Sequence, residues 1–391
     1  MVTRSTLPLA GVRVLDLSRL LPGPYTTWVL ASMGAEVVKV EDTAAGDYAR
    51  NMPPLLGEVS ALFHVLNRGK RSIALDLKSE QGQALLLRMA AKVDVVVEQF
   101  RPGVMERLGV GYERLRQVRE DIVLCSMTGY GQTGPMAALA GHDINFQALA
   151  GTLWMDGEAG GPPSVSGIPS GDLFGAMAAV SRIMAALYRR ERSSTGEWID
   201  LAITDVVASV AAPLFAAYSQ QGEAAPGRGE GVLNGGLAQY GTYRTRDGRY
   251  LAVGALEPKF LQRFAELAGR PEWAQALPLP GPHQDSLRAE IAEVIATRSR
   301  DEWEQLLEGV DCCVSPVLEP SEAAAHPQFR ARGLAAGAPA ELGPARWVET
   351  PMGELVEGNA PAQGEHSAEL LLELGLEAQE IAQLRACGVI R

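Results

Sequence analysis

Along its first third, the chain alternates short runs of valine, isoleucine and leucine with longer stretches of helical periodicity. The apolar runs have the composition of β-strands and lie at 12–17, 35–41, 71–77, 94–100 and 121–127. A turn with Pro22, Gly23 and Pro24 leads into a helix-like apolar stretch that runs to Met33. Residues 79–92 also have helical periodicity, and Ser79 is placed to cap this second helix. Buried strands that alternate with helices indicate a parallel sheet covered on both faces. The pattern therefore predicts an α/β fold that binds its ligand at the carboxyl ends of the strands.

The middle of the chain is more helical. Residues 171–198 and 203–219 are typical of two apolar helices, and the glycine-rich segment 220–236 is the best candidate for a linker. Beyond it, residues 240–255 have the alternation of a β-hairpin with Asp247–Gly248 at the turn. Helical segments and one more apolar strand follow, at 257–268, 285–298, 300–309 and 312–318.

A chain of 391 residues exceeds the size of a single hydrophobic core, so we expect two domains. The large domain is predicted over residues 1–224, and a smaller α+β domain over residues 225–310. Residues 311–391 are expected to return to the large domain.

Composition and charge narrow the class of partner. Hydrophobic residues make up 47% of the chain and charged residues 21%, which is typical of a folded globular protein. The net charge of −12 argues against nucleic acid or an anionic membrane as the main partner. A local basic pocket for an anionic ligand remains compatible with this total.

The number and spacing of the cysteines predict the cellular compartment of the protein. The chain has four of them, Cys125, Cys312, Cys313 and Cys387, with no CxxC motif. A reduced, cytoplasmic protein fits this usage best. The first residues lack the apolar run of a signal peptide, and no run of about 18 apolar residues predicts a membrane span.

A GxGxxG pattern, formed by Gly129, Gly131 and Gly134, follows the fifth predicted strand. The dinucleotide-binding interpretation requires a helix that begins there, and this motif normally follows the first strand of the sheet. A glycine-rich loop that lets the backbone approach some other ligand is the favoured interpretation.

Polar residues at three places in the chain are candidates for chemistry. His142 and Asp143 open an apolar helical run, where Asp143 suits a helix cap and His142 is less easily explained. Asp172 opens the long apolar helix, where it is either a cap or a carboxylate beside N–H donors that stabilise developing negative charge. Glu257 precedes Pro258 and is either an N-cap residue or an ordinary surface acid.

Basic residues gather at the ends of the third and fourth predicted strands. They are Lys70, Arg71, Lys78, Arg101 and Arg107. Each can be an ordinary solvated charge, but together they mark a place where an anionic ligand would dock in an acidic protein.

Several segments resemble the family III CoA-transferases, a family that includes the formyl-CoA and carnitine CoA-transferase types and alpha-methylacyl-CoA racemase. They are LAGVRVLDLSRLLPGPYTTWVLASMGAEVVKVE, NRGKRSIALDLKSEQG, VVVEQFRPGVMERLG, SMTGYGQTGP and GEHSAELLLELG, and they span nearly the whole chain. The resemblance implies a Rossmann-like, CoA-binding large domain built from both chain ends and a smaller central domain. It also implies a homodimer with interlocked subunits.

The resemblance implies two alternative chemistries. In the transferases an aspartate matching Asp172 attacks the acyl-CoA thioester as a nucleophile. In the racemases the matching aspartate acts as acid and base together with a histidine that matches His142 in GHDIN, and a glutamate in GALEPKF matches Glu257. Glu257 is then expected to hydrogen-bond His142. The segments LNGGLAQYGTYRTRDGRYLAVGALEPKF and WEQLLEGVDCCVSPVL are similar to the racemase branch.

For CoA itself, the matching segments imply contacts from residues that follow the first, third and fourth strands. These are Leu21, Leu75, Asp76, Leu77, Lys78, Gln99, Phe100, Arg101 and Arg107. Asp42 departs from the family pattern, since relatives often carry an arginine after the second strand. This departure puts the contacts to the CoA phosphates in question.

We therefore expect a cytoplasmic racemase or epimerase that interconverts (2R)- and (2S)-2-methylacyl-CoA thioesters through an enolate. The alternative is a CoA-transferase that uses Asp172 as its nucleophile, and a third possibility is an acyl-CoA-binding protein without turnover. No metal and no nucleotide redox cofactor is expected beyond the CoA of the substrate. The expected partners are an acyl-CoA thioester and a second copy of the chain, with no nucleic acid and no membrane.

Overall fold

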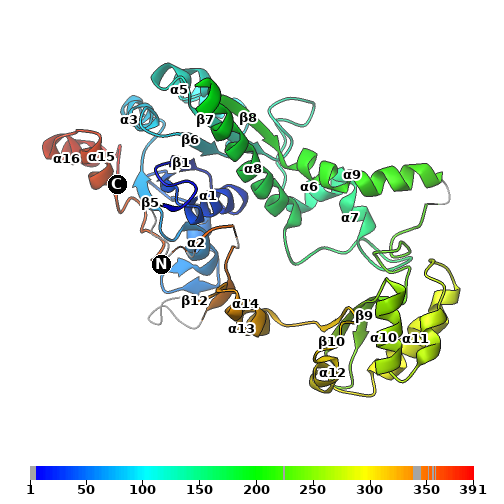
Figure 1. Ribbon diagram of the computed structural model, residues 1–391. Helices are drawn as coiled ribbons and strands as arrows, with labels where there is room; N and C mark the ends of the chain where they lie inside the picture. The colour runs from blue at the N-terminus through cyan, green and yellow to red at the C-terminus, as the bar shows by residue number, and fades with distance from the viewer. Residues whose placement is uncertain (1–5, 223–224, 338–344, 351, 355, 357) are drawn as a thin grey trace. The chain divides into compact units, whose positions relative to one another are not determined.

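The computed structural model describes residues 6–222, 225–337, 345–350, 352–354, 356 and 358–391. The chain forms two compact units. Unit 1 consists of Met1–Gln147, Ile168–Ser209 and Ala324–Arg391, and unit 2 of Ala148–Gly167 and Val210–Ala323. Both chain ends belong to unit 1 (Figure 1). The domain limits expected after residues 224 and 310 stay predictions.

Unit 1 is built on a six-stranded parallel sheet with the order β5-β2-β1-β6-β7-β8. The strands are β1 (Arg13–Leu17), β2 (Glu36–Glu41), β5 (Arg71–Ala74), β6 (Val95–Glu98), β7 (Val123–Thr128) and β8 (Glu197–Ala202). Counted within the sheet alone, this order is 3-2-1-4-5-6, the order of dinucleotide-binding folds. The predicted α/β class with a parallel sheet is confirmed, and the order reverses between β1 and β6.

Helices cover both faces of the sheet. One face carries α3 (Glu80–Ala90), α5 (Tyr112–Val118), α15 (Ser367–Glu373) and α16 (Ala378–Ala386), whose apolar residues share one core with alternate strand residues such as Leu15 and Leu17. On α1 (Pro22–Ser32) and α8 (Ser170–Ser193), which contact each other, small residues such as Ala31, Ala176 and Ala179 are buried. Because side chains alternate along a strand, Asp16 points to the opposite face from Leu15 and Leu17.

The sixth strand, β8, is not among the elements expected from the sequence. The expected helix over 171–198 ends at Ser193, and Ser194 then adopts a left-handed conformation with φ of 53°. Strand β8 follows at the sheet edge and pairs with β7 from Glu197 to Ala202. Its sequence alternates polar and apolar residues directly after a helical pattern, so the apolar runs that mark the buried strands do not identify it.

Shorter elements complete unit 1. They are the 3-10 helix η2 (Tyr48–Asn51), β3 (Leu55–Leu56), β4 (Val59–Ser60), α2 (Ala61–Asn67), α4 (Val104–Arg107), α14 (Pro327–Ala331), β12 (Ala335–Gly337) and β13 (Arg346–Val348). Three helices lie at the chain positions where the units alternate, namely α6 (Asp143–Ala150), α9 (Ile203–Gln221) and α13 (Pro320–Ala325). Helix α2 begins at Ser60, whose hydroxyl accepts the N–H of Leu62.

Unit 2 has an antiparallel sheet with the order β11-β10-β9 and a core of its own around Phe264, Trp273 and Trp303. Its elements are α7 (Thr152–Met155), β9 (Tyr240–Arg244), β10 (Tyr250–Gly254), α10 (Pro258–Leu267), η4 (Pro271–Gln275), α11 (His283–Ile295), α12 (Arg300–Leu307) and β11 (Val314–Pro316). Strands β9 and β10 form the predicted hairpin, and Gly248 at its turn has a φ of 81°. Within the described part of the chain, no helix is both long and apolar enough to cross a membrane.

Candidate functional site

A cleft of about 1120 Å³ opens in unit 1 at the carboxyl ends of the parallel strands. Its walls come from the segments that follow β1, β2, β5, β6 and β7, including Ser18–Leu20, Asp42–Ala44 and Gln99–Pro102. Because β1 and β6 flank the point where the strand order reverses, the segments after them leave the sheet in opposite directions. A crevice at such a point is the usual ligand site of an open parallel sheet.

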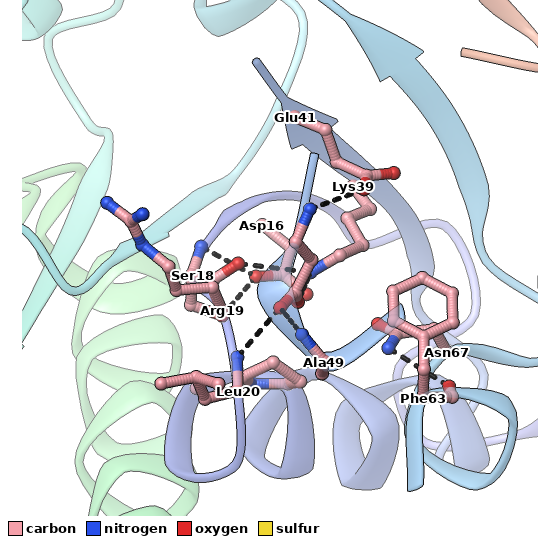
Figure 2. A network of polar contacts seen from close by, with 12 residues as sticks. Asp16, Ser18, Arg19, Leu20, Lys39, Glu41, Ala49, Phe63 and Asn67 are labelled. Atoms are coloured by element: carbon pink, nitrogen blue, oxygen red, sulfur yellow. Dashed lines mark hydrogen bonds and ion pairs between the residues drawn. The ribbon is translucent and has the colours of Figure 1, made fainter. Parts of the chain in front are cut away.

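The turn after β1 is anchored by Asp16, which is completely buried. Its carboxylate accepts a hydrogen bond from the Ser18 N–H at 3.0 Å (Figure 2). It also accepts the Thr27 hydroxyl at 2.6 Å and pairs with the Lys70 ammonium at 2.9 Å. Burial alone would raise the pKa of Asp16, but the charges of Lys70 and Lys39 outweigh burial and hold that pKa well below its usual range. Asp16 is therefore a permanent buried anion that fixes the start of the cleft wall.

A second buried pair, Lys39 and Asp47, joins the turns after β1 and β2. The Lys39 ammonium lies 2.8 Å from the Asp47 carboxylate and donates to the Ser18 carbonyl at 3.0 Å. Asp47 accepts the N–H groups of Leu20 at 3.1 Å and Ala49 at 2.9 Å. In Figure 2 the dashed lines from Leu20 and Ala49 meet at one oxygen atom. Leu20 has a φ of 65°, an uncommon conformation for a residue with a side chain. The hydrogen bond that the Leu20 N–H donates to the Asp47 carboxylate helps to hold Leu20 in this conformation.

The side chain of Asp42, the residue that departs from the family pattern, is hydrogen-bonded to the backbone of the residues that follow it. Its carboxylate oxygen Oδ1 accepts N–H groups from Ala44 and Ala45 at 2.8 Å each and from Gly46 at 3.3 Å. Successive N–H groups of this kind otherwise form a nest for an anion. In this chain the nest is filled by an internal carboxylate.

Gln99, at the end of β6, ties this strand to the turn after β1. Its side-chain oxygen accepts the N–H of Arg19 at 3.3 Å and that of Gly23 at 3.2 Å. A Cβ at Gly23 would lie 2.5 Å from that oxygen and 2.2 Å from the Ser18 Cβ, so only glycine fits. Gln99 therefore holds the turn after β1 in place and also lines the cleft.

His142 and Asp172 both line the cleft, although 29 residues separate them in the chain. His142 is exposed immediately before α6, and its carbonyl accepts the N–H of Asn145 at 2.8 Å. Asp172 is half-buried in the first turn of α8. The structure thus brings together two of the three residues that the sequence nominates for catalysis.

Asp143 connects the two helices that carry this pair. One of its carboxylate oxygens accepts the backbone N–H of Asp172 at 2.9 Å, and the other accepts the side-chain amide of Gln147 at 2.6 Å. Burial, followed by the charge of Asp143, raises the pKa of Asp172 to about 7. Asp172 can therefore exchange a proton near neutral pH.

The contact between Asp143 and the Asp172 N–H bears on the expectation that the N-terminus of α8 stabilises negative charge on a ligand. The N–H of Asp172 is taken by Asp143, and that of Leu173 donates to the Pro169 carbonyl at 3.2 Å. Two of the backbone N–H groups at the start of this helix, which were expected to stabilise developing negative charge, are therefore already hydrogen-bonded within the protein.

Glu257 lies in unit 2, where it is the exposed residue before Pro258 at the start of α10. It occupies the predicted N-cap position, but its side chain makes no capping hydrogen bond. Its expected contact with His142 stays a prediction.

Seven of the nine residues predicted to contact CoA line the cleft. They are Leu75, Asp76, Leu77, Lys78, Gln99, Phe100 and Arg101. The other two, Leu21 and Arg107, are not among its lining residues; Leu21 precedes α1, and Arg107 is exposed at the end of α4. Their predicted contacts with CoA stay predictions.

Sequence reasoning missed other lining residues, among them Arg19, Leu20, Tyr48 and Tyr130. The first two directly follow a predicted strand, so their position in the chain could have nominated them. Tyr48 could not have been found in this way, because its place depends on the fold of a loop.

The glycines of the GxGxxG pattern form a loop after β7. Gly131 and Gly134 have φ values of 87° and 89°, and a Cβ at Gly129 would lie 2.3 Å from the Phe146 ring. The next helix, α6, begins only at Asp143. The loop therefore lacks the helix of a dinucleotide fingerprint, and Gly129 gives close backbone approach to the cleft.

Comparison with known proteins agrees with this geometry. The model of CoA-transferase family III matches residues 9–367. The chain belongs to CoA-transferase family III. Among the described residues of this family III protein, no group of three or more histidine, cysteine and acidic side chains is arranged to hold a metal ion.

Relatives of this family III chain fall into both chemical branches. It is 35% identical to alpha-methylacyl-CoA racemase of Mus musculus over 98% of this chain and 97% of the relative. It is 32% identical to succinyl-CoA:glutarate CoA-transferase of Homo sapiens over 98% of this chain and 90% of the relative. A CAIB/BAIF family protein from Brucella suis has a similar structure, with a TM-score of 0.81, 30% identity, and coverage of 94% of this chain and 99% of its own. These similarities support an enzyme that handles CoA thioesters.

Proposed function

We propose that this protein is a 2-methylacyl-CoA racemase that inverts the configuration of the α-carbon of its thioester substrate. The observation that carries the proposal is the presence of His142 and Asp172 on the walls of one cleft. Racemisation removes a proton from one face of the α-carbon and returns one to the other face, so it needs two acid–base groups. A histidine and an aspartate whose pKa lies near 7 are suited to that exchange at neutral pH.

In this mechanism one residue takes the α-proton as the thioester becomes an enolate, and the other residue donates a proton to the opposite face. His142 takes the proton from one epimer and Asp172 from the other, so each residue serves as base in one direction and as acid in the reverse direction. The cleft residues Leu75–Lys78 and Gln99–Arg101 bind the CoA part of the substrate.

CoA transfer is the second candidate function, and the similarity of this chain to CoA-transferases of the same family supports it. In that reaction the Asp172 carboxylate attacks the thioester carbonyl, CoA thiolate leaves, and a mixed anhydride forms. The thiolate then attacks the aspartyl carbonyl, which releases the first acyl group as its carboxylate and leaves an Asp172–CoA thioester. The acceptor carboxylate attacks this thioester and displaces the thiolate, which then attacks the acceptor's carbonyl in the new anhydride, so that the new CoA thioester leaves and the Asp172 carboxylate is restored. Such a nucleophile must be deprotonated, and His142 has no part in the steps.

A deuterium exchange experiment separates the two functions. The protein is incubated in D2O with pure (2R)- or (2S)-2-methylacyl-CoA, and the α-hydrogen is followed by NMR together with the configuration of the product. A racemase incorporates deuterium and converges on the same epimer mixture from either side. Absence of exchange with several branched substrates, together with a hydroxylamine-trapped acyl group at Asp172, would establish transfer instead.

We also propose that the protein is a cytoplasmic homodimer whose subunits are interlocked. Light scattering coupled to size-exclusion chromatography measures its mass in solution. Because interlocked subunits cannot separate without unfolding, dilution should not release folded monomer; a monomeric peak would contradict the proposal.

A further inference from the structure

The cleft contains three cations, and the racemase proposal assigns two of them, Lys78 and Arg101, to the CoA part of the substrate but gives Arg19 no task. Arg19, Lys78 and Arg101 line it, and within the described part of the chain no carboxylate lies within ion-pair distance of any of them. Of the acidic residues that also line the cleft, Glu41 pairs with Arg50, Asp47 pairs with Lys39, and Asp76 accepts the backbone N–H of Lys78 at 3.0 Å. In a protein with a net charge of −12, unpaired cations at a ligand cleft point to an anionic ligand group.

Arg19 differs from the other two cations because an aromatic ring accompanies it. Its guanidinium carbon lies 4.9 Å from the centre of the Tyr48 ring, and its side chain points away from the buried polar network (Figure 2). Tyr48 keeps 55% of its surface exposed, so this ring has a free face. A planar guanidinium can bind two phosphate oxygens at once, and an aromatic ring offers a stacking surface to a nucleobase.

A single buried carboxylate fixes the positions of both residues. Asp47 accepts the N–H of Leu20, which follows Arg19, and the N–H of Ala49, which follows Tyr48. The N–H of Arg19 itself is bound to Gln99 at 3.3 Å. The backbone of Arg19 and Tyr48 is therefore held in place before any ligand arrives, which lowers the entropy cost of binding.

The position of the Asp42 carboxylate indicates that a phosphate of the ligand needs a binding site other than the loop after β2. The loop that follows β2 has three N–H groups directed to one point, but the Asp42 carboxylate occupies that point. A phosphate would be repelled there by the carboxylate and would find the amides already in use. The anion of the ligand must therefore be bound elsewhere on the cleft wall.

We propose that Arg19, supported by Tyr48, binds a phosphate group of the nucleotide part of the CoA thioester. This inference rests on the proposed function and adds to it a binding residue and a subsite. The phosphate is either the diphosphate or the 3′-phosphate of the CoA nucleotide, since both present the same oxygens to a guanidinium.

The test compares ligands that contain or lack the nucleotide. Wild type and Arg19→Ala are titrated by calorimetry with a 2-methylacyl-CoA, its dephospho-CoA analogue and the matching S-pantetheine thioester. We expect Arg19→Ala to weaken binding of the CoA thioester about 10- to 100-fold, which is the loss typical of a charge-assisted hydrogen bond. Affinity for the pantetheine thioester should stay within about twofold of wild type, since that ligand has no nucleotide phosphate.

The dephospho-CoA analogue locates the phosphate. An equal loss with this analogue assigns Arg19 to the diphosphate, and a vanished loss assigns it to the 3′-phosphate. Tyr48→Phe should bind CoA thioester like wild type because the ring face remains, whereas Tyr48→Ala should weaken it. Arg13→Ala is the matched control, since Arg13 lies at the other end of β1 and is half-exposed in a surface pair with Glu36.

Two results overturn the inference. One is an unchanged affinity of Arg19→Ala for the CoA thioester, and the other is an equal loss for CoA and pantetheine thioesters, which would mean that the variant merely disturbs the cleft. If wild type exchanges the α-proton but shows either result, only the Arg19 assignment fails. If wild type binds none of the three ligands, the proposed function fails as well.

Discussion

The backbone N–H of Asp172 donates to the carboxylate of Asp143 at 2.9 Å, so two acidic residues lie side by side at the start of α8. The second oxygen of Asp143 is held by Gln147, which keeps the charge in place. This arrangement holds Asp172 in the half-buried first turn and favours its protonated form. Asp143, the first residue of α6 in the segment GHDIN, therefore binds the start of α8 instead of capping its own helix.

The Asp143→Asn variant should change the pH dependence of turnover. The amide oxygen can still accept the Asp172 N–H, but the negative charge that raises the pKa of Asp172 is lost. In the direction that uses Asp172 as base, the wild-type rate should rise with pH through about 7, and in the variant this rise should occur at lower pH. Initial rates of α-deuterium exchange from each epimer, measured between pH 5 and 9, provide the check. Asp143→Ala, which also removes the acceptor, should lose rate at every pH; identical profiles for wild type and Asp143→Asn would rule out the charge effect.

Replacement of either member of the acid–base pair should abolish racemisation but leave half of the exchange chemistry. In His142→Ala, Asp172 can still take the proton from one epimer, so deuterium exchange should persist from that epimer and fall about 100- to 10,000-fold from the other. Asp172→Asn should show the opposite preference.

The measurement for this pair is α-deuterium incorporation from pure (2R) and (2S) substrates. His326→Ala serves as the histidine control, because His326 caps the short helix α14 and does not line the cleft. Loss of exchange from the same epimer in both variants would contradict a two-base mechanism.

The buried ion pair between Asp16 and Lys70 should matter far more for stability than an exposed pair on the same sheet. Asp16→Ala removes the carboxylate that compensates a completely buried ammonium, so the free energy of unfolding should fall by about 3–5 kcal/mol. Glu36→Ala breaks the half-exposed pair with Arg13 and should cost less than about 1 kcal/mol. Urea unfolding followed by circular dichroism measures both, and equal losses would refute the distinction.

Glu98 should make stability depend on pH around neutrality. Burial raises the pKa of this carboxyl from 4.5 to about 7, in spite of hydrogen bonds from Ser126 and the Phe100 N–H. Because the folded pKa lies above the unfolded value, the stability that this group contributes is complete below about pH 4.5 and is lost as the pH rises through about 7.

The Glu98→Gln variant isolates that contribution. The neutral amide avoids the cost of a buried charge, so the variant should gain on the order of 2–3 kcal/mol relative to wild type between pH 5 and 8.5. Unfolding free energies of both proteins are compared at matched pH values. A constant difference across this range would show that the pKa of Glu98 is the same in the folded and unfolded chain, and that burial does not raise it.

Local pattern was sufficient for a large part of the fold. Apolar runs identified β1, β2, β5, β6 and β7, because strands buried on both faces carry little else. The dipeptide Asp247–Gly248 located the β9–β10 hairpin, since its turn needs a residue with positive φ. His142 and Asp172 were nominated by chain position and family resemblance, without any information on their distance in space.

Only the tertiary structure decided which strands lie side by side and which side chains interact. Strand order, which places the ends of β1 and β6 beside each other, depends on long-range packing that no local pattern encodes. Asp143 looks like a cap for its own helix, but its carboxylate reaches α8 because the fold brings the two helix starts together. Likewise Asp16 and Lys70, 54 residues apart, become one buried pair, and Arg19 meets Tyr48 only because Asp47 holds both loops. The sequence by itself determined which segments become strands and helices, since local sterics and hydrophobic periodicity act over a few residues. Pairing of charges across the chain was decided by the tertiary structure, because electrostatic partners are selected by distance in space.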